Sequence, residues 1–394
     1  MPRRGTAAAF HQRMRATAAV FLVACTSSPA VHAPSRDQLT RFAHVENVIP
    51  VVVKVGDDTG LAIVDTGNPL SDLDQSKFAS VAALPLDGGT VASLQLDGST
   101  SPDVYVVGSP FTDLTADPTF PIVGNMGCSA FCAGVPSFDY RDGTFALDAT
   151  PPTGLGADIA IPFSFEGGNI DNFGQRVTSR VIVTVELEGH AYQMMLDTGA
   201  TSVSVSERAF AALTADGRTT IAGQTAIVSG ASTSTLTRAA SITLAGVEVD
   251  DAVVIHDSGF DTVLTAISND VGHTIDGSLG GTFLNHFYVT VDYANRIVHL
   301  APYDDVSFVL DQGHTIGLSL TTDAAGQLVI ASVAGDAAAK GLHVGDVVQA
   351  IDGIDASAGY YALAEATYGP LGATKTVELA DTSATLAVDE LLPL

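Results

Sequence analysis

The chain carries the stretch LAIVDTGN at residues 61–68 and a second stretch, QMMLDTGA, at residues 193–200. In each stretch an apolar run ends at the tripeptide Asp-Thr-Gly, which begins at Asp65 in the first and at Asp197 in the second. The residues before each tripeptide alternate in polarity around a short polar turn, a pattern typical of two half-buried strands. We therefore expect each Asp to leave a packed sheet on a tight loop, where Gly lets backbone N–H groups approach the carboxylate.

Similarity between the two halves of the chain extends beyond this tripeptide. The two copies of Asp-Thr-Gly are 132 residues apart. Two later blocks also match, residues 94–107 with 242–255 and residues 122–147 with 275–300, and the order of the blocks is kept. The pattern indicates one internal duplication at the scale of a domain, too long for a solenoid repeat. Two similar β lobes related by a pseudo-two-fold axis would bring their acidic loops face to face.

Two Asp-Thr-Gly loops, each followed by an apolar segment that ends in Gly, resemble the pepsin-like and retropepsin-like aspartic peptidases. The segments here are Ile122–Gly124 and Thr274–Gly277, and the resemblance covers residues 45–303. It implies a mainly β fold with two pseudo-symmetric acid-protease β-barrel lobes. It also implies an aspartic endopeptidase of extended or unfolded polypeptides, in which Asp65 and Asp197 are the catalytic pair.

The implied chemistry needs two carboxyl groups in contact. Two carboxyl groups at that distance cannot both be ionised, because their negative charges repel. One group is therefore ionised and deprotonates a water, while the other is protonated and donates to the substrate carbonyl. The pair then titrates as a unit. The resemblance places Thr66 and Thr198 in a buried crossed hydrogen-bond network and assigns loop support to Gly67, Gly199 and Ala200. No metal and no organic cofactor is expected.

The residue after the first tripeptide departs from the family pattern. Asn68 stands where Ser, Thr or Ala is usual, whereas residues 200–202, Ala-Thr-Ser, follow the second tripeptide in the manner of retroviral enzymes. We expect Asn68 to support its own loop by a hydrogen bond to the carboxylate. Without such a bond the first Asp would be poorly prepared for catalysis, and the alternative is a noncatalytic, peptide-binding envelope lipoprotein.

A difference in length between the halves predicts a flap. Between the first and second matched blocks the second half has 16 extra residues, which fall around Ser229, Gly230 and Ala231. The resemblance implies a mobile β-hairpin that covers the substrate and excludes water. We expect the second lobe to supply this flap, with residues 86–89 as a reduced counterpart. The alternative is a long surface loop without a role.

The N-terminus resembles an export signal. Residues 1–24 place four Arg before an apolar run that is too short to span a bilayer. The run ends at Leu-Val-Ala-Cys, which resembles a bacterial lipobox, so Cys25 is expected to be acylated and residues 25–41 to form a tether. The alternative is ordinary signal cleavage after Ala33, which would remove Cys25.

The two remaining cysteines, Cys128 and Cys132, lie only in the first half, since the second half has Gly281 and Asn285 at the matching positions. Export would let a disulfide between them persist. A separation of one helical turn suits a disulfide poorly, so two free thiols are the alternative. No His or further Cys lies nearby at ligand spacing, and we expect no metal site.

The composition and the pattern change near the C-terminus. Residues 341–346 are Gly-Leu-His-Val-Gly-Asp and residues 351–353 are Ile-Asp-Gly, which resemble the PDZ domain of exported bacterial proteases. The resemblance implies a PDZ domain over residues 312–394 that binds an extended C-terminal peptide by strand addition. A helix near residues 361–366 would form one wall of its groove. Its carboxylate loop would consist of Ile316, Gly317 and Leu318. The alternative is a structural or autoinhibitory module with an empty groove.

Charge limits the partners of the chain. The formal net charge is −27, and loss of the four Arg of the signal takes it to about −31. So acidic a surface argues against nucleic acid and against charge-driven binding to anionic membranes, which leaves the lipid as the anchor. We expect an exported protein, lipid-anchored in the bacterial cell envelope. The predicted layout has lobe 1 at residues 42–150, a linker with the first strand of lobe 2 at residues 151–175, and the rest of lobe 2 at residues 176–303.

Overall fold

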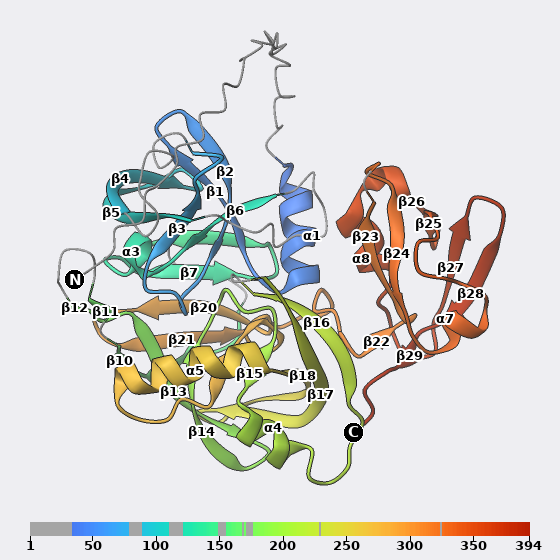
Figure 1. The fold of residues 1–394 in the computed structure, drawn as a ribbon. Helices are drawn as coiled ribbons and strands as arrows, with labels where there is room; N and C mark the ends of the chain where they lie inside the picture. The colour runs from blue at the N-terminus through green and yellow to red at the C-terminus, as the bar shows by residue number, and fades with distance from the viewer. Residues whose placement is uncertain are drawn as a thin grey trace, which may run out of the picture. The chain divides into compact units, whose positions relative to one another are not determined.

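A computed structural model of the chain describes residues 34–78, 89–109, 121–148, 155–167, 169–170, 176–227, 230–323 and 325–394. Most of its elements are β-strands, which form two barrels, a sheet to which both halves contribute, and a C-terminal module (Figure 1). The prediction of a mainly β fold with two β-barrel lobes is confirmed.

Six strands close the first barrel in the order β1-β2-β6-β3-β5-β4. They are β1 Pro50–Val55, β2 Asp58–Val64, β3 Ser71–Asp74, β4 Gly89–Leu96, β5 Ser99–Ser109 and β6 Ile122–Met126. In β1, Val51, Val53 and Val55 are buried while Lys54 is exposed, as expected when successive side chains of a strand face opposite sides of a sheet.

The second barrel repeats this strand order. Its strands run β13-β14-β19-β15-β18-β17, and pairing between β13 and β17 closes the ring. They are β13 Arg180–Leu187, β14 His190–Leu196, β15 Val203–Val205, β17 Gly230–Leu244, β18 Val247–Asp257 and β19 Gly277–Leu279. Strand for strand this is the order of the first barrel, so the internal duplication extends to topology. Two further strands, β10 Ser164–Glu166 and β16 Ile221–Ile227, extend the sheet.

Both halves contribute strands to a five-stranded sheet ordered β8-β7-β20-β21-β9. Its strands are β7 Pro136–Asp139, β8 Thr144–Leu147, β9 Ile159–Pro162, β20 Phe287–Asp292 and β21 Ile297–Pro302. One apolar core runs from this sheet into both barrels. The segment predicted as linker and first strand of lobe 2 is therefore divided, because β9 joins the shared sheet whereas β10 pairs with β13. A short hairpin, β11 Asn169–Ile170 with β12 Arg176–Val177, follows.

The tether predicted for residues 25–41 is wrong for residues 36–41, because helix α1 spans Arg36–Glu46. Ser35 caps the helix: its side chain accepts a hydrogen bond from the Gln38 backbone, and the Gln38 side chain accepts one from the Ser35 N–H. This capping box is a helix-start signal that the sequence contains. The buried side chains of Leu39, Phe42 and Val45 hold α1 in place. Cys25 and residues 26–33 lie outside the described residues.

Among the described residues of the two lobes, the other helices are short except for α5. They are α3 Cys128–Phe131, α4 Glu207–Leu213, α5 Ser258–Val271 and α6 Gly281–Leu284. Within the described part of the chain, no helix has the length and apolar character needed to cross a membrane.

Residues 314–390 form a module with an apolar core of its own. Its elements are β22 His314–Thr315, β23 Leu318–Thr322, β24 Leu328–Val333, α7 Asp336–Ala339, β25 Val348–Ile351, β26 Ile354–Asp355, a 3-10 turn at Ala356–Ala358, α8 Tyr360–Ala366, β27 Thr374–Leu379, β28 Ser383–Ala387 and β29 Asp389–Glu390. The first and last strands pair with each other. Helix α8 also contacts α1, where the Phe42 and Tyr361 ring centroids are 5.1 Å apart.

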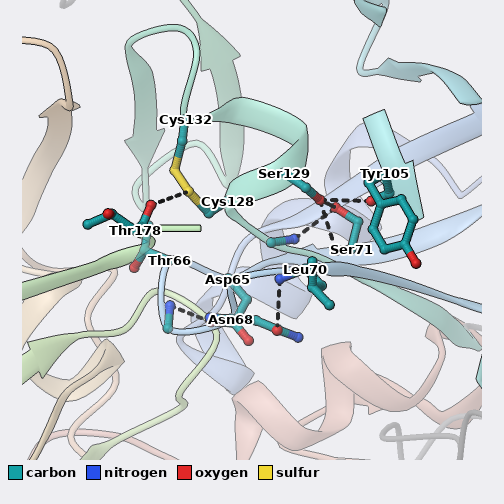
Figure 2. Close-up of a disulfide and its surroundings, with 12 residues drawn as sticks. Asp65, Thr66, Asn68, Leu70, Ser71, Tyr105, Cys128, Ser129, Cys132 and Thr178 are labelled. Carbon is teal, nitrogen blue, oxygen red and sulfur yellow. Dashed lines mark hydrogen bonds between the residues drawn. A yellow bond between two sulfur atoms is a disulfide. The ribbon is translucent and has the colours of Figure 1, made fainter. Parts of the chain in front are cut away.

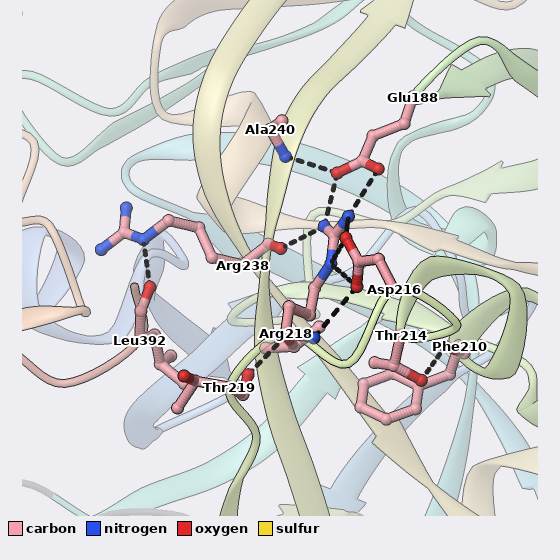
Figure 3. A network of polar contacts seen from close by, with 10 residues as sticks. Glu188, Phe210, Thr214, Asp216, Arg218, Thr219, Arg238, Ala240 and Leu392 are labelled. Atoms are coloured by element: carbon pink, nitrogen blue, oxygen red, sulfur yellow. Dashed lines mark hydrogen bonds and ion pairs between the residues drawn. The ribbon is translucent and has the colours of Figure 1, made fainter. Parts of the chain in front are cut away.

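Two arginines fix the base of the β16–β17 hairpin (Figure 3). Arg218 donates to Glu188 Oε1 at 2.5 Å and to Asp216 Oδ2 at 2.7 Å. It also donates to the carbonyl of Arg238, which belongs to β17. The buried Arg238 side chain in turn donates from Nε to the Leu392 carbonyl at 3.0 Å and from Nη2 to Asp311 Oδ1 at 2.8 Å. Arg238 thus joins the second barrel to the C-terminal segment.

Candidate active site

The two acidic loops leave matching strands. Asp65 follows β2 and donates its backbone N–H to the Met126 carbonyl at 2.9 Å. Asp197 follows β14 and donates in the same way to the Leu279 carbonyl at 3.1 Å. Since β2 is parallel to β6 and β14 is parallel to β19, each Asp is fixed by the strand that contains the apolar segment of its own half or begins at its glycine.

A crossed hydrogen-bond network joins the loops. Thr66 donates from Oγ1 to the Leu196 carbonyl at 2.8 Å, and Thr198 donates from Oγ1 to the Val64 carbonyl at 2.7 Å. The backbone N–H of each threonine donates to the Oγ1 of the other at 3.1 Å. Each hydroxyl therefore donates and accepts across the pseudo-two-fold axis, and both side chains are buried. The crossed network predicted for these threonines has this geometry.

The carboxyl groups of Asp65 and Asp197 meet between the loops and share a hydrogen bond. Each lies against the glycine of the opposite loop. A Cβ added to Gly199 would lie 2.5 Å from Asp65 Cγ, and one added to Gly67 would lie 2.8 Å from Asp197 Cγ. These distances are too short for any side chain, so the loops need glycine to let the carboxyl groups approach.

The two carboxyl groups have different surroundings. Asp65 Oδ1 accepts the backbone N–H of Gly67 at 2.7 Å and that of Asn68 at 3.1 Å, and Oδ2 accepts Nδ2 of Asn125 at 2.6 Å. Asp197 Oδ1 accepts the Gly199 N–H at 3.2 Å. Asp65 is half-buried, whereas Asp197 is only 8% exposed. The ionised form of Asp65 therefore has more donors and more access to solvent.

Burial raises the pKa of Asp197 well above the ordinary value, and the charge of Asp65 and the hydrogen bond between the two groups raise it further. The Gly199 N–H and the Ser278 hydroxyl act in the opposite direction on this pKa. The net direction favours a proton on Asp197 under conditions where an exposed Asp is ionised. One protonated and one ionised carboxyl is the state that water activation by such a pair needs.

The side chain of Asn68 does not reach the Asp65 carboxylate, which corrects one expectation. Its Oδ1 accepts the Leu70 N–H at 3.2 Å (Figure 2), and its Nδ2 donates to Asp72 Oδ2 at 3.1 Å. The loop support comes instead from the Asn68 backbone N–H. In the second loop, the backbone N–H of Ala200 donates to the Asp197 carbonyl at 3.3 Å.

Sequence reasoning missed Asn125 and Ser278. They occupy matching positions in β6 and β19, directly after the glycines of the two apolar segments. Both are buried. The signal available in the sequence was a polar residue at the same place in both copies of an otherwise apolar motif.

Two buried tyrosines at matching positions, Tyr140 and Tyr293, lie near the pair. Neither hydroxyl has a hydrogen-bond partner among the described residues. Burial raises the pKa of both, and the charge of Asp197 adds to this for Tyr140 as the charge of Asp65 does for Tyr293. Both hydroxyls therefore stay neutral.

Tyr293→Phe and Tyr140→Phe should not destabilise the protein. Each change removes a buried hydroxyl without removing a partner, so we expect the free energy of unfolding to stay unchanged or to rise by up to about 1 kcal/mol. Urea unfolding followed by circular dichroism measures this. A loss of more than about 1 kcal/mol would show that these hydroxyls do have partners.

Cys128 and Cys132 form a disulfide with an S–S distance of 2.08 Å and a Cα–Cα distance of 4.9 Å (Figure 2). Of the two alternatives left open by spacing, the structure has the bonded form. The helix that begins at Cys128 supports the first acidic loop, because the Cys128 N–H donates to the Asn68 carbonyl at 2.9 Å. Beside it, the Ser71 and Ser129 hydroxyls lie 2.9 Å apart.

The remaining predicted residues lie in the β16–β17 hairpin, in the C-terminal module, or outside the described residues. The β16–β17 hairpin pairs Ile227 with Gly230 and Ala226 with Ala231, while Ser229 and residues 86–88 are outside the described residues. In the C-terminal module, the Ile316 N–H donates to the Thr367 carbonyl, Gly317 has a φ of 76°, and β23 begins at Leu318. In the described ranges, no three His, Cys, Asp or Glu side chains gather as metal ligands.

Comparison with known proteins adds one family match. Residues 183–283 match the aspartyl protease family model. The matched region contains Asp197 and the apolar segment Thr274–Gly277. Among solved structures, the chain is similar to an aspartic proteinase from Irpex lacteus, with 14% identity, a TM-score of 0.41, and coverage of 66% of this chain and 98% of that one. No curated protein sequence matches the chain.

Proposed function

We propose that the chain is an aspartic endopeptidase that hydrolyses peptide bonds of extended or unfolded polypeptides. The observation that carries the proposal is the contact between the Asp65 and Asp197 carboxyl groups, with the crossed threonines beneath them. The family-model match over residues 183–283 supports it. A protein that only bound peptides would have no need to keep the buried Asp197 next to a second acid, since burial of charge is costly.

The reaction uses the two groups in different roles. Asp65, ionised, accepts a proton from a water whose oxygen attacks the carbonyl carbon. Asp197, protonated, donates to the carbonyl oxygen, which gives a neutral tetrahedral diol. Collapse of the diol breaks the C–N bond, and the proton held by Asp65 passes to the leaving nitrogen while a diol proton returns to Asp197. Atoms and protons balance, and no further group is needed.

Digestion of a reduced, alkylated protein between pH 3 and pH 8 tests this function. We expect internal cleavage that pepstatin inhibits. Activity should fall at low pH, where the pair as a unit holds two protons, and at higher pH, where the pair holds none. Because the pKa of Asp197 is raised, the upper limit should lie above the range of an ordinary carboxyl. Tight binding of peptides without any cleavage in this range would favour the noncatalytic alternative.

We propose that two parts of the chain hold the substrate: the β16–β17 hairpin as a flap, and the C-terminal module as a peptide-binding domain. The β16–β17 hairpin extends the second barrel at the place predicted for a flap, and its base is fixed by Arg218 and Arg238. In the C-terminal module, β23 pairs with β24 along one edge and contacts α8. We propose that this module is a PDZ domain that takes a peptide C-terminus between β23 and α8. Titration with one peptide as free acid and as amide tests it, and equal affinities would refute it.

We also propose export and a lipid anchor on Cys25, from the sequence pattern of residues 1–25. The mass of the mature N-terminal peptide decides between acylation of Cys25 and cleavage after Ala33. A mature chain that still begins at residue 1 would refute both.

A further inference from the structure

Asn125 adds a third N–H donor to the surroundings of Asp65, which favours the ionised form. The side chain lies in β6, between β2 and β3, and is 5% exposed. Its Nδ2 donates to Asp65 Oδ2 at 2.6 Å, while both backbone donors of the loop go to Oδ1. An amide NH₂ can donate but not accept. A proton on Oδ1 would compete with its two donors, and a proton on Oδ2 would weaken the Asn125 hydrogen bond, because a neutral carboxyl is a weaker acceptor than a carboxylate.

The matching position in the second lobe is filled differently. Ser278 lies there near Asp197, and its buried hydroxyl, which can either donate or accept, has no hydrogen-bond partner among the described residues. Asp197 otherwise receives the single Gly199 N–H, at 3.2 Å. The surroundings of Asp197 therefore suit both protonation states, whereas the three donors around Asp65 favour its ionised form.

We propose that Asn125 is a positioning residue that decides which acid of the pair holds the proton. By donating to Oδ2 it keeps Asp65 ionised as the base, and so leaves the proton on Asp197 as the donor. The inference rests on the proposed peptidase function. It assigns to a side chain outside both Asp-Thr-Gly loops a part in the asymmetry of the pair, beside the extra loop N–H that Asp65 accepts.

The pH dependence of kcat/KM tests the inference. Wild type and Asn125→Leu are compared on a quenched-fluorescent peptide taken from a cleavage site found in the digestion of the unfolded protein. Removal of the donor should move the acidic limb of kcat/KM upward by about one pH unit, since a hydrogen bond to a charged group changes the proton affinity by about tenfold or more. Asn125→Ser keeps a hydroxyl donor and should therefore move the acidic limb less than Asn125→Leu does.

Asn285→Leu is the matched control. Asn285 is also a buried amide, and its Nδ2 donates to Asn47 Oδ1 at 2.8 Å, but it does not touch the pair. Asn285→Leu should lower the thermal midpoint of unfolding while leaving the position of the acidic limb unchanged. A merely structural role for Asn125 would make the two Leu variants behave alike.

The outcomes separate the inference from the function on which it rests. If the wild-type protein cleaves nothing, the peptidase proposal fails. If it cleaves and Asn125→Leu keeps the wild-type acidic limb, the inference fails and the peptidase stands. Should Asn125→Leu not fold, Asn125→Ala decides, because it also lacks the donor and an acidic limb identical to that of wild type would overturn the inference there too.

Discussion

Asp197→Asn is expected to lower kcat/KM by about 10³-fold or more and, at neutral pH, to make the protein more stable. The loss of activity follows because an amide cannot supply the acidic proton that the substrate carbonyl needs. The gain in stability follows from the raised pKa of Asp197, whose first cause is burial. A raised folded-state pKa means that the folded protein binds this proton more tightly than the unfolded chain. Stability is therefore lost as the pH rises through that pKa, and Asn removes the loss.

Asp65→Asn is the informative counterpart. It should abolish activity as well, because the base is lost. Its effect on stability should have the opposite sign, since Asp65 accepts three N–H groups and an amide NH₂ in its place would oppose at least one of them. Thermal midpoints at pH 7, measured beside peptide cleavage, distinguish the two variants. Equal shifts in both midpoints would contradict the asymmetry described for the pair.

Thr66→Val and Thr198→Val should be the most destabilising conservative changes in the site. Thr66 is 0% exposed and Thr198 is 1% exposed, and each Val leaves one N–H and one carbonyl without their partner. We expect each change to lower the free energy of unfolding by about 2–4 kcal/mol. Cleavage should also fall by about 10²-fold, because a shift of the loops by roughly 1 Å separates the acids.

Thr237→Val provides the comparison for these variants. Thr237 is equally buried, but its hydroxyl makes one hydrogen bond, to the Thr219 carbonyl at 2.8 Å, far along the chain from the acidic loops. Loss of this hydrogen bond should lower the free energy of unfolding by about 1 kcal/mol with little change in cleavage. Urea unfolding and the cleavage assay report both quantities, and a cost for Thr66→Val no larger than that for Thr237→Val would argue against a role for the crossed network.

The sequence predicted those parts of the structure that depend on local patterns present in both halves of the chain. The alternating strands and the matched blocks predicted two β lobes, and the barrels have the same strand order. The contact of Asn125 with Asp65 was not predictable in this way, because parallel pairing of β2 with β6 brings together residues 60 positions apart. The place of β9 also depends on a distant partner, β21. Helix α1, by contrast, had a local signal in the capping residues Ser35 and Gln38. This signal was missed because it directly follows a Ser- and Pro-rich stretch, which indicated a tether.

The difference between Asn125 and Ser278 has an evolutionary consequence. In a homodimer of identical subunits, both acids would face the same side chain at this position, and the two acids would have equal affinity for the proton. Once two copies are fused in one gene, a mutation in one copy leaves its twin untouched. Broken symmetry can then be inherited, and each half becomes free to specialise.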